Sequence, residues 1–389
     1  MLLKRAIEPQ IQKYLTGGRG KILFIWGPRR SGKTTLLLKL KKKLRVPIFN
    51  FNTITDQEVF VPKRDQLQKI AAENKVILID EVQNFPESTV GMKILIDEFR
   101  PKIIATGSSE LRQKSNDFDS LAGRYTELYC LPLSIEEIRQ NSPVKSYRES
   151  NFLVNLYEEL QIFGCYPEIY LHKNMSEKSR IDRLEKIIEA YVLKDIVNIY
   201  ELKNAKLARD ILIKIALQLG SEASLREIAS SLQANVGTVG NYIEIFIKNH
   251  ILIPLRSFKV NTRRAVSENR KLYFADLGIR NALIKDFRPT AMRQDRGGVF
   301  ENFVISEIEK AIKNRQLKIN KYFYREYGGR EVDVVLEDYY KNYWTYEIKS
   351  GIKSAKNVFP LASRFSVATT ENLYKIVREA GEGRLSPTG

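Results

Sequence analysis

Short apolar runs alternate with helical patterns along the first third of the chain. Segments 21–27, 76–83 and 102–109 each begin with an apolar run and end in glycine, acidic or small polar residues. Such runs are typical of strands in a parallel sheet that is covered on both faces. A lysine-rich helical pattern follows the first run up to residue 40. This order predicts an α/β domain with a parallel sheet in residues 1–135.

Helical periodicity dominates the middle of the chain. Residues 136–204 are predicted to form a helical linker region, with a Gly-Pro corner in "GCYPEIYL". Apolar positions at helical spacing then recur on both sides of a short turn, and two short strand patterns follow. This order predicts a helix-turn-helix within a winged helix in residues 205–290. The apolar positions of the two helices are Leu225, Ile228, Ala229, Leu232, Val236, Val239, Tyr242, Ile243 and Phe246.

The last segment returns to an α/β pattern. The amphipathic sequence "GGVFENFVISEIEKAIKN" predicts a helix over 297–314 with Phe300 and Phe303 on its core face. Two strand patterns, "REVDVVLED" and "YWTYEIKSG", come next, and one more strand and one more helix follow before residue 382. A small α/β domain is therefore predicted in residues 291–380.

Composition limits the class of protein. A chain of 389 residues is long enough for two or three domains, and we expect three. No uncharged run reaches the roughly 18 apolar residues of a membrane span, and charges interrupt the amino terminus before a signal peptide forms. The two cysteines, Cys130 and Cys165, exclude a disulfide framework, and with His172 and His250 they are too scattered for a zinc site. We therefore expect a cytoplasmic protein without a membrane partner.

The chain carries a large excess of positive charge. Its 64 Lys and Arg residues against 46 Asp and Glu residues give a formal charge of +18 and a pI near 9.6. Such a charge favours a polyanionic partner, and DNA is the partner we expect. The alternative is a generally basic composition without a nucleic-acid partner.

A glycine-rich loop follows the first apolar run. Residues 27–34, "GPRRSGKT", fit the pattern G-x-x-x-x-G-K-[ST] at every fixed position. Backbone N–H groups of such a loop surround phosphate oxygens, Lys33 reaches the β and γ phosphates, and the Thr34 hydroxyl binds Mg²⁺. We therefore predict an ATP site. Its nucleotide-binding residues are Gly27, Pro28, Arg29, Arg30, Ser31, Gly32, Lys33, Thr34 and Thr35.

An acidic pair in the second apolar run completes the predicted site. Asp80 is expected to hold Mg²⁺ together with Thr34, and Glu81 is expected to polarise the attacking water as the catalytic residue. The alternative is a solvated turn. These residues predict a Mg²⁺-dependent ATPase with ATP and Mg²⁺ as its cofactors.

Two further places are candidates for nucleotide contact. The third apolar run ends in "TGSS", where Thr106, Ser108 or Ser109 either hydrogen-bonds the γ phosphate or the attacking water, or simply makes a turn. Arg124 in "SLAGR" precedes another strand pattern. It is predicted to contact the nucleotide as a finger or a sensor, and the alternative is an ordinary surface charge.

The order of these motifs resembles a known group of proteins. "GPRRSGKTT", "ILIDEVQ", "IIATGSS" and "SLAGR" followed by "LPLS" resemble an archaeal and bacterial group of AAA-type P-loop ATPases. The resemblance covers nearly the whole chain. It implies an AAA-type ATPase module followed by a domain of uncharacterised function.

The helix-turn-helix leaves two alternatives open. In a DNA-binding winged helix, Asn235, Thr238 and Asn241 of the second helix would face a major groove and a basic wing would contact phosphates, mainly without sequence specificity. In the other alternative, the winged helix contacts proteins. The basic residues of the predicted wing are Arg256, Lys259, Arg263, Arg264, Arg270 and Lys271, against the single acid Glu268.

The last domain carries charged residues on predicted strands. Glu347 and Lys349 are two residues apart, so a strand directs both to one face, and Asp333 stands between valines of the preceding strand. The set resembles the PD-(D/E)xK nuclease superfamily. This resemblance implies catalytic roles for Asp333, Glu347 and Lys349, and metal ligation by Glu301, Asp333 and Glu347. The alternatives are a structural ion-pair cluster and a nuclease fold that has lost its activity.

Two functions follow from these patterns. The first is ATP binding and hydrolysis in a protein that acts on DNA, with a metal-dependent nuclease-like domain at its C-terminus. The alternative is a nucleotide-controlled scaffold or signalling switch with an inactive nuclease fold. Both are compatible with a homo-oligomer or a protein partner.

Overall fold

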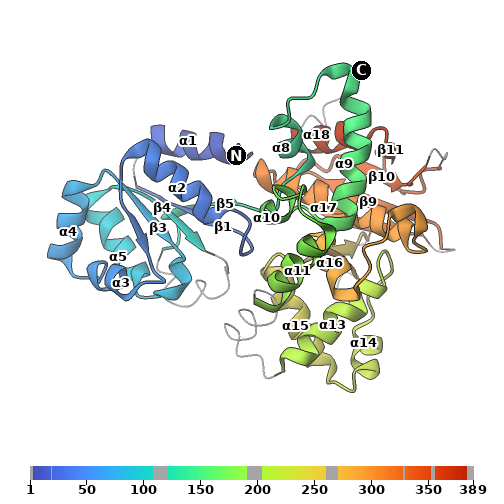
Figure 1. The fold of residues 1–389 in the computed structure, drawn as a ribbon, viewed down its shortest axis with the longest axis horizontal. Helices are drawn as coiled ribbons and strands as arrows, with labels where there is room; N and C mark the ends of the chain where they lie inside the picture. The colour runs from blue at the N-terminus through green and yellow to red at the C-terminus, as the bar shows by residue number, and fades with distance from the viewer. Residues whose placement is uncertain are drawn as a thin grey trace. The chain divides into compact units, whose positions relative to one another are not determined.

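The computed structural model describes most of the chain. It forms two compact units, one of Lys4–Pro132 and one of Leu133–Gly389 together with Met1–Leu3 (Figure 1). Each unit has hydrophobic cores of its own. The described residues are 3–18, 20–107, 121–190, 204–259, 270–326, 329–351 and 355–382.

The N-terminal unit contains a parallel five-stranded sheet in the order β2-β3-β4-β1-β5. All five residues of β1 are buried, as the continuous apolar run predicts for a strand covered on both faces. Ile25 lies beside Thr106, so β1 and β4 bring their carboxyl ends to the same edge. The strands are β1 (Ile22–Trp26), β2 (Ile48–Asn50), β3 (Val76–Asp80), β4 (Lys102–Gly107) and β5 (Tyr125–Tyr129).

Helices cover both faces of this sheet. Alternate residues of β1 enter different cores, with Leu23 packed against α1 and α2, and Phe24 packed on the side of α3, α4 and α5. The predicted α/β domain with a parallel sheet is therefore confirmed. The helices are α1 (Glu8–Thr16), α2 (Lys33–Leu44), α3 (Ile54–Val59), α4 (Arg64–Glu73) and α5 (Ser88–Ile94), with the short helices η1 (Val82–Asn84) and η2 (Leu95–Phe99).

The C-terminal unit contains a mixed six-stranded sheet in the order β11-β10-β9-β8-β6-β7. The β6–β8 and β10–β11 pairs are parallel, and the other three pairs are antiparallel. The two strands predicted for the wing, β6 and β7, thus belong to the same sheet as the last strands of the chain. The strands are β6 (Leu252–Ser257), β7 (Arg270–Phe274), β8 (Asn320–Arg325), β9 (Glu331–Glu337), β10 (Tyr343–Ile348) and β11 (Arg364–Ala368).

Helices of the C-terminal unit form two cores. Apolar residues of α9, α17 and α18 pack on the sheet, and apolar residues of α11, α13, α14, α15 and α16 pack together in the second core. The predicted helix-turn-helix is the pair α14 and α15, while the division of this unit at residues 204 and 290 stays a prediction. Among the described helices of the whole chain, none combines the length and the apolar character that a membrane crossing needs. The helices are α8 (Ile135–Gln140), α9 (Glu149–Phe163), α10 (Pro167–Tyr170), α11 (Glu177–Ile187), α13 (Ala205–Leu217), α14 (Leu225–Ser231), α15 (Val236–Lys248), α16 (Leu277–Ile284), α17 (Arg296–Asn314) and α18 (Leu373–Glu382), with η3 (Ser146–Arg148) and η6 (Thr290–Met292).

A buried ion pair on α17 holds the first residues of the C-terminal unit. Lys310 and Glu307 are 2% and 0% exposed and pair with each other. Lys310 Nζ donates to the Leu133 carbonyl at 3.0 Å, and Glu307 Oε2 accepts from the Ile135 N–H at 2.9 Å. Each buried charge therefore has the partners that offset its loss of water.

Candidate nucleotide site and carboxylate cluster

The loop between β1 and α2 requires glycine at two positions. Gly27 has φ 156°, and a Cβ atom there would lie 2.1 Å from the Cys130 carbonyl oxygen. Gly32 has φ 102° and is the residue before the first turn of α2. Both conformations suit glycine alone. The fixed glycines of the sequence pattern thus allow the loop to turn closely against the end of β5 and into the helix.

Lys33 points back into this loop. Its ammonium donates to the carbonyls of Gly27 at 2.8 Å and Pro28 at 2.9 Å, and the side chain is buried. Burial lowers the pKa of Lys33, and the nearby Glu81 carboxylate opposes that effect by favouring the charged form. Its hydrogen bonds to the two carbonyls place the Lys33 amino group where a phosphate-binding loop needs it.

The first turn of α2 and the carboxyl ends of β3 and β4 bring hard oxygen atoms together beside Lys33. Thr34 Oγ1 donates to Asp80 Oδ2 at 2.9 Å, and the Thr106 hydroxyl donates to Asp80 Oδ1. A hydroxyl and a carboxylate next to a phosphate site fit Mg²⁺, which prefers oxygen ligands and takes the rest from phosphates and water. Thr34 and Asp80 would hold the ion. Thr106, one of the three candidates at the end of β4, contacts the carboxylate of Asp80.

Glu81 lies one residue beyond the end of β3. It has a left-handed backbone conformation with φ 57°, and its side chain accepts a hydrogen bond from Gln83 Nε2. Gln83 is fully buried, so its hydrogen bond restrains the orientation of the Glu81 carboxylate. Gln83 is not among the residues predicted from the sequence, although its place in "IDEVQ", two residues after the acid, is a local signal that a short turn would bring the two side chains together.

Arg5 is a second residue near the phosphate-binding loop that is not predicted from the sequence. Its guanidinium is 8% exposed and donates to the Ser31 carbonyl at 2.7 Å and to the Leu131 carbonyl at 2.5 Å. It therefore ties the phosphate-binding loop to the segment after β5. No sequence pattern near Arg5 indicates this contact, because its partners lie far along the chain.

The other predicted nucleotide-binding residues lie in the loop or just after it. Pro28 and Ser31 are buried, while Arg30, Thr34 and Thr35 are exposed at the surface of the unit. These roles stay predictions. Ser108 and Ser109 lie outside the described residues.

Arg124 lies at the opposite edge of the sheet. It immediately precedes β5, its carbonyl accepts from the Ile22 N–H at the start of β1, and its side chain pairs with Asp97 at 2.8 Å. The five residues of β1 separate this edge from the loop after Trp26, which is about 16 Å at about 3.3 Å per residue. The structure therefore does not bring Arg124 to the phosphate-binding loop of its own chain, and its contact with a nucleotide stays a prediction.

The C-terminal unit gathers the predicted carboxylates into a cluster. Glu301 comes from α17, Asp333 from β9 and Glu347 from β10, and the Ile348 N–H donates to Asp333 Oδ2 at 2.6 Å. Burial raises the pKa of Asp333 to about 7, and the charges of Glu301 and Glu347 add to the effect. Lys349 Nζ lies 2.7 Å from Glu347 Oε1. All four residues of the predicted nuclease set are thus close in space.

Lys271 joins this cluster, which corrects its prediction as a phosphate-contacting residue of a wing. It is 2% exposed, lies 3.3 Å from Glu301 Oε1 and also pairs with Glu331. Tyr273, two residues on along β7, donates to Glu301 Oε1. Alternate residues of a strand share a face, so β7 directs both side chains toward α17.

The carboxylate cluster does not fit a divalent ion as it stands. Within the described ranges, no three His, Cys, Asp or Glu residues come together in a set that could hold a metal. The ammonium of Lys271 takes the Glu301 oxygen that a metal would use. The predicted metal ligands Glu301, Asp333 and Glu347 are therefore neighbours without a formed metal site.

The helix-turn-helix offers fewer charged contacts than predicted. Asn235 is the N-cap of α15, and its Oδ1 accepts from the Gly237 N–H at 2.8 Å. Arg270 pairs with Glu244 of α15, while Thr238 and Asn241 are exposed. Of the other wing residues, Arg256 is exposed on β6 and Lys259 is half-buried, while Arg263, Arg264 and Glu268 lie outside the described residues.

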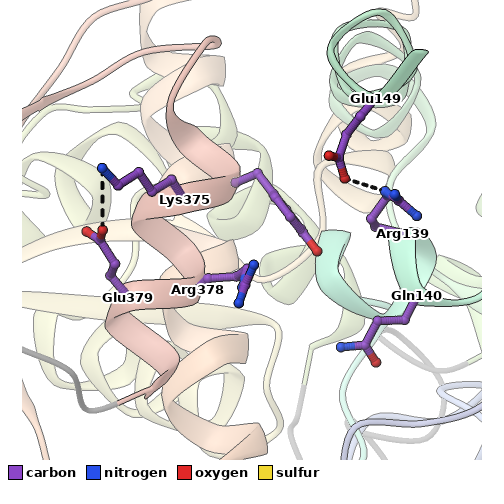
Figure 2. A pocket seen from close by; sticks show the side chains of 7 residues that line it. Arg139, Gln140, Glu149, Lys375, Arg378 and Glu379 are labelled. Carbon is purple, nitrogen blue, oxygen red and sulfur yellow. Dashed lines mark hydrogen bonds and ion pairs between the residues drawn. The ribbon is translucent and has the colours of Figure 1, made fainter. Parts of the chain in front are cut away.

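A surface hollow of about 570 Å³ lies between α8, the start of α9 and α18 (Figure 2). Two pairs of charged side chains in its lining contact each other: Arg139 pairs with Glu149 at 2.6 Å, and Lys375 lies 3.8 Å from Glu379. Its lining residues are Arg139, Gln140, Glu149, Tyr374, Lys375, Arg378 and Glu379.

Comparison with known proteins gives distant similarity along most of the chain. "Uncharacterized protein MJ1637" of Methanocaldococcus jannaschii is 22% identical over 396 residues, which cover 92% of this chain and 81% of that protein. The RuvB Holliday junction branch migration motor of Thermotoga maritima is 14% identical, with a TM-score of 0.29 over 64% of this chain and 85% of that chain. AMPPCP-bound DnaA from Aquifex aeolicus is 18% identical, with a TM-score of 0.26 over 63% of this chain and 88% of that chain. Scores this low support no statement about the fold or function of this chain.

Family models divide the chain into three parts. A model described as an AAA domain matches residues 19–139. Two domains of unknown function, DUF8612 and DUF4143, match residues 154–290 and 296–385. The chain therefore carries an AAA domain, which implies nucleotide binding in general terms, followed by two domains of unknown function.

Proposed function

We propose that the N-terminal unit is a Mg²⁺-dependent ATPase. The observation that carries the proposal is the hydrogen-bonded set of Thr34, Asp80 and Thr106 beside the buried ammonium of Lys33. It lies at the carboxyl ends of adjacent parallel strands, where the loop and the N-terminus of α2 favour phosphate. The AAA domain model over residues 19–139 supports the same conclusion.

Each residue of the set has a chemical task in this proposal. Loop N–H groups and Lys33 bind the β and γ phosphates, and Thr34 and Asp80 hold Mg²⁺, which neutralises charge that develops during phosphoryl transfer. Glu81 accepts a proton from the attacking water as the general base. Gln83 keeps the Glu81 carboxylate oriented through its hydrogen bond.

Two variants test the assignment. Lys33→Ala should abolish binding of a fluorescent ATP analogue, because it removes the buried cation of the loop. Glu81→Gln should keep the affinity for ATP and slow phosphate release by roughly 100-fold, since only the proton acceptor is lost. Lys41→Ala, an exposed lysine on the same helix, is the matched control. Normal turnover in Lys33→Ala would contradict the proposal.

DNA is the partner that we infer for the C-terminal unit. The formal charge of +18 on the whole chain favours a polyanionic partner. Within this unit, Thr238, Asn241 and Lys248 of α15 and Arg226 of α14 are exposed. Contacts of this kind bind phosphates without reading sequence strongly. A scaffold that contacts proteins is the alternative, and a homo-oligomer is compatible with either.

Fluorescence anisotropy with a short DNA duplex separates these alternatives. The logarithm of the binding constant should fall linearly with the logarithm of salt concentration, and Arg226→Ser with Lys248→Ser should reduce the slope by roughly 0.9 per lost phosphate contact. Lys178→Ser with Lys186→Ser, two exposed lysines on α11, controls for total charge. Equal slopes in both double variants would exclude α14 and α15 as the DNA contact.

A metal-dependent nuclease is the second candidate function. The gathering of Glu301, Asp333 and Glu347 with Lys349 favours it, and the presence of Lys271 among them favours the inactive nuclease fold. Supercoiled plasmid incubated with Mg²⁺ or Mn²⁺ decides between the two. Nicking that disappears in Asp333→Ala would support the nuclease, and intact plasmid under every divalent ion would support the inactive fold.

A further inference from the structure

The carboxylate cluster of the C-terminal unit contains a cation of its own. Lys271 Nζ lies 3.3 Å from Glu301 Oε1 and pairs with Glu331, and Asp333 is close enough for its charge to act on the ammonium. The Phe323 ring centroid is 5.5 Å from the same Nζ. With 2% of the residue exposed, carboxylates and an aromatic ring take the place of solvent around this charge.

Both carboxylates that contact Lys271 are held by a second partner. Glu301 accepts from the Tyr273 hydroxyl, and Glu331 accepts from Arg325 Nε at 2.8 Å. Lys271 and Tyr273 share a face of β7, so one strand supplies both groups that contact Glu301. The position of the ammonium is therefore defined by several elements, β7, α17 and β9, rather than by one flexible side chain.

We propose that the Lys271 ammonium occupies the place of a divalent cation in this cluster, so that the native protein needs no metal there and removal of the ammonium creates a metal site. The inference concerns the C-terminal unit alone and does not depend on ATP hydrolysis by the other unit.

Charge and geometry prevent the Lys271 ammonium and a divalent cation from occupying the cluster together. Mg²⁺ needs about six oxygen ligands at about 2.1 Å and sheds water reluctantly. The ammonium already contacts the Glu301 carboxylate, and it would repel a second cation bound to the same carboxylate. Movement of the Lys271 ammonium out of the cluster is also unfavourable. It would leave the buried carboxylates without a cation, and the ammonium would lose its carboxylate partners.

Mn²⁺ titration followed by electron paramagnetic resonance tests the proposal on the full chain without nucleotide. An Asp80→Asn background removes the metal ligand of the N-terminal unit. In this background, Asp333→Asn should leave Mn²⁺ binding unchanged, because Lys271 keeps metal out of the cluster. Lys271→Met should bind Mn²⁺ at least about tenfold more tightly, and addition of Asp333→Asn should abolish the gain.

Lys341→Met is the matched control, since Lys341 is an exposed lysine that pairs with Glu337 in the same unit. It should not change Mn²⁺ binding. The proposal is overturned if Asp333→Asn weakens Mn²⁺ binding in the protein that keeps Lys271, or if a folded Lys271→Met protein gains no Mn²⁺ affinity. The Asp333→Asn comparison needs no change at Lys271, so it can overturn the proposal even if Lys271→Met does not fold. Plasmid nicking that needs Mg²⁺ or Mn²⁺ and disappears in Asp333→Ala would also overturn the proposal, because it would require a metal in the cluster of the native protein.

Discussion

Replacement of Asp333 by asparagine should change how the stability of the C-terminal unit depends on pH. The carboxyl group lies among β7, β9, β10 and α17. Burial together with the charges of Glu301 and Glu347 raises its pKa to about 7 from a usual value of 3.8, and this outweighs the opposite effects of the Ile348 N–H and the Lys271 charge. The folded protein thus keeps a proton at Asp333 that the unfolded chain releases. Stability from this proton is fully present below about pH 4 and is lost as the pH rises to about 7.

The size of the effect follows from the difference between the two pKa values. Each pKa unit corresponds to about 1.4 kcal/mol, so ionisation of Asp333 costs on the order of 4 kcal/mol of the free energy of unfolding above pH 7. Asparagine carries no charge, and its carbonyl oxygen can still accept from the Ile348 N–H. Asp333→Asn should therefore be more stable than the parent at pH 8 and nearly equal to it at pH 4.

Urea denaturation at several pH values measures this difference. The chain has two tryptophans, Trp26 in the N-terminal unit and Trp344 on β10, so a Trp26→Phe background makes fluorescence report on the C-terminal unit. Asp338→Asn is the control with the opposite sign, because hydrogen bonds from Asn342 outweigh partial burial and hold the pKa of Asp338 below its usual value. If Asp333→Asn destabilised the unit at pH 8, Asp333 would be an ionised partner of Lys271, and the reasoning would fail.

Three further outcomes are expected. Gly27→Ala should destabilise the N-terminal unit by about 1–3 kcal/mol, measured by Trp26 fluorescence in a Trp344→Phe background, because its Cβ would lie 2.1 Å from the Cys130 carbonyl oxygen. Gln83→Ala should leave ATP affinity unchanged and slow phosphate release by up to about 100-fold, since it frees the Glu81 side chain. Lys310→Met should destabilise the C-terminal unit by about 3–5 kcal/mol in urea denaturation, because Glu307 would remain buried without its partner.

Local patterns predicted the elements of both units because each pattern depends on near neighbours. The strands β1, β3 and β4 are buried on both faces, so they appear as apolar runs that need no knowledge of the rest of the fold. The glycines of the loop after β1 also stand at a fixed spacing, so the sequence pattern of this loop can be recognised without knowledge of the rest of the fold. Helix α15 begins at an asparagine cap and continues with apolar residues at helical spacing. The sequence could therefore place these elements to within a few residues.

Arg124 shows what local patterns leave out. The segment after it was predicted as a strand, and β5 is that strand. A residue that precedes a parallel strand lies at the amino edge of the sheet, whereas the phosphate-binding loop follows β1 at the carboxyl edge. The pairing of β5 with β1 is needed to see this, and strand order is not visible in the sequence.

Lys271 shows that local sequence also does not reveal whether a charged side chain is buried or exposed. In the sequence it is one of several basic residues between two strand patterns, and a count of charges groups it with a solvated wing. Its partners Glu301 and Glu331 lie 30 and 60 residues further along the chain. The long aliphatic part of a lysine can be buried at little cost when its ammonium is paired, so neither its residue type nor its neighbours distinguish a buried cation from an exposed one. The alternation of β7 is the one local signal, since Lys271 shares a face with Tyr273, a residue that faces the core. A basic residue on the apolar face of a predicted strand should thus be considered as an internal counter-ion before it is assigned to a nucleic-acid surface.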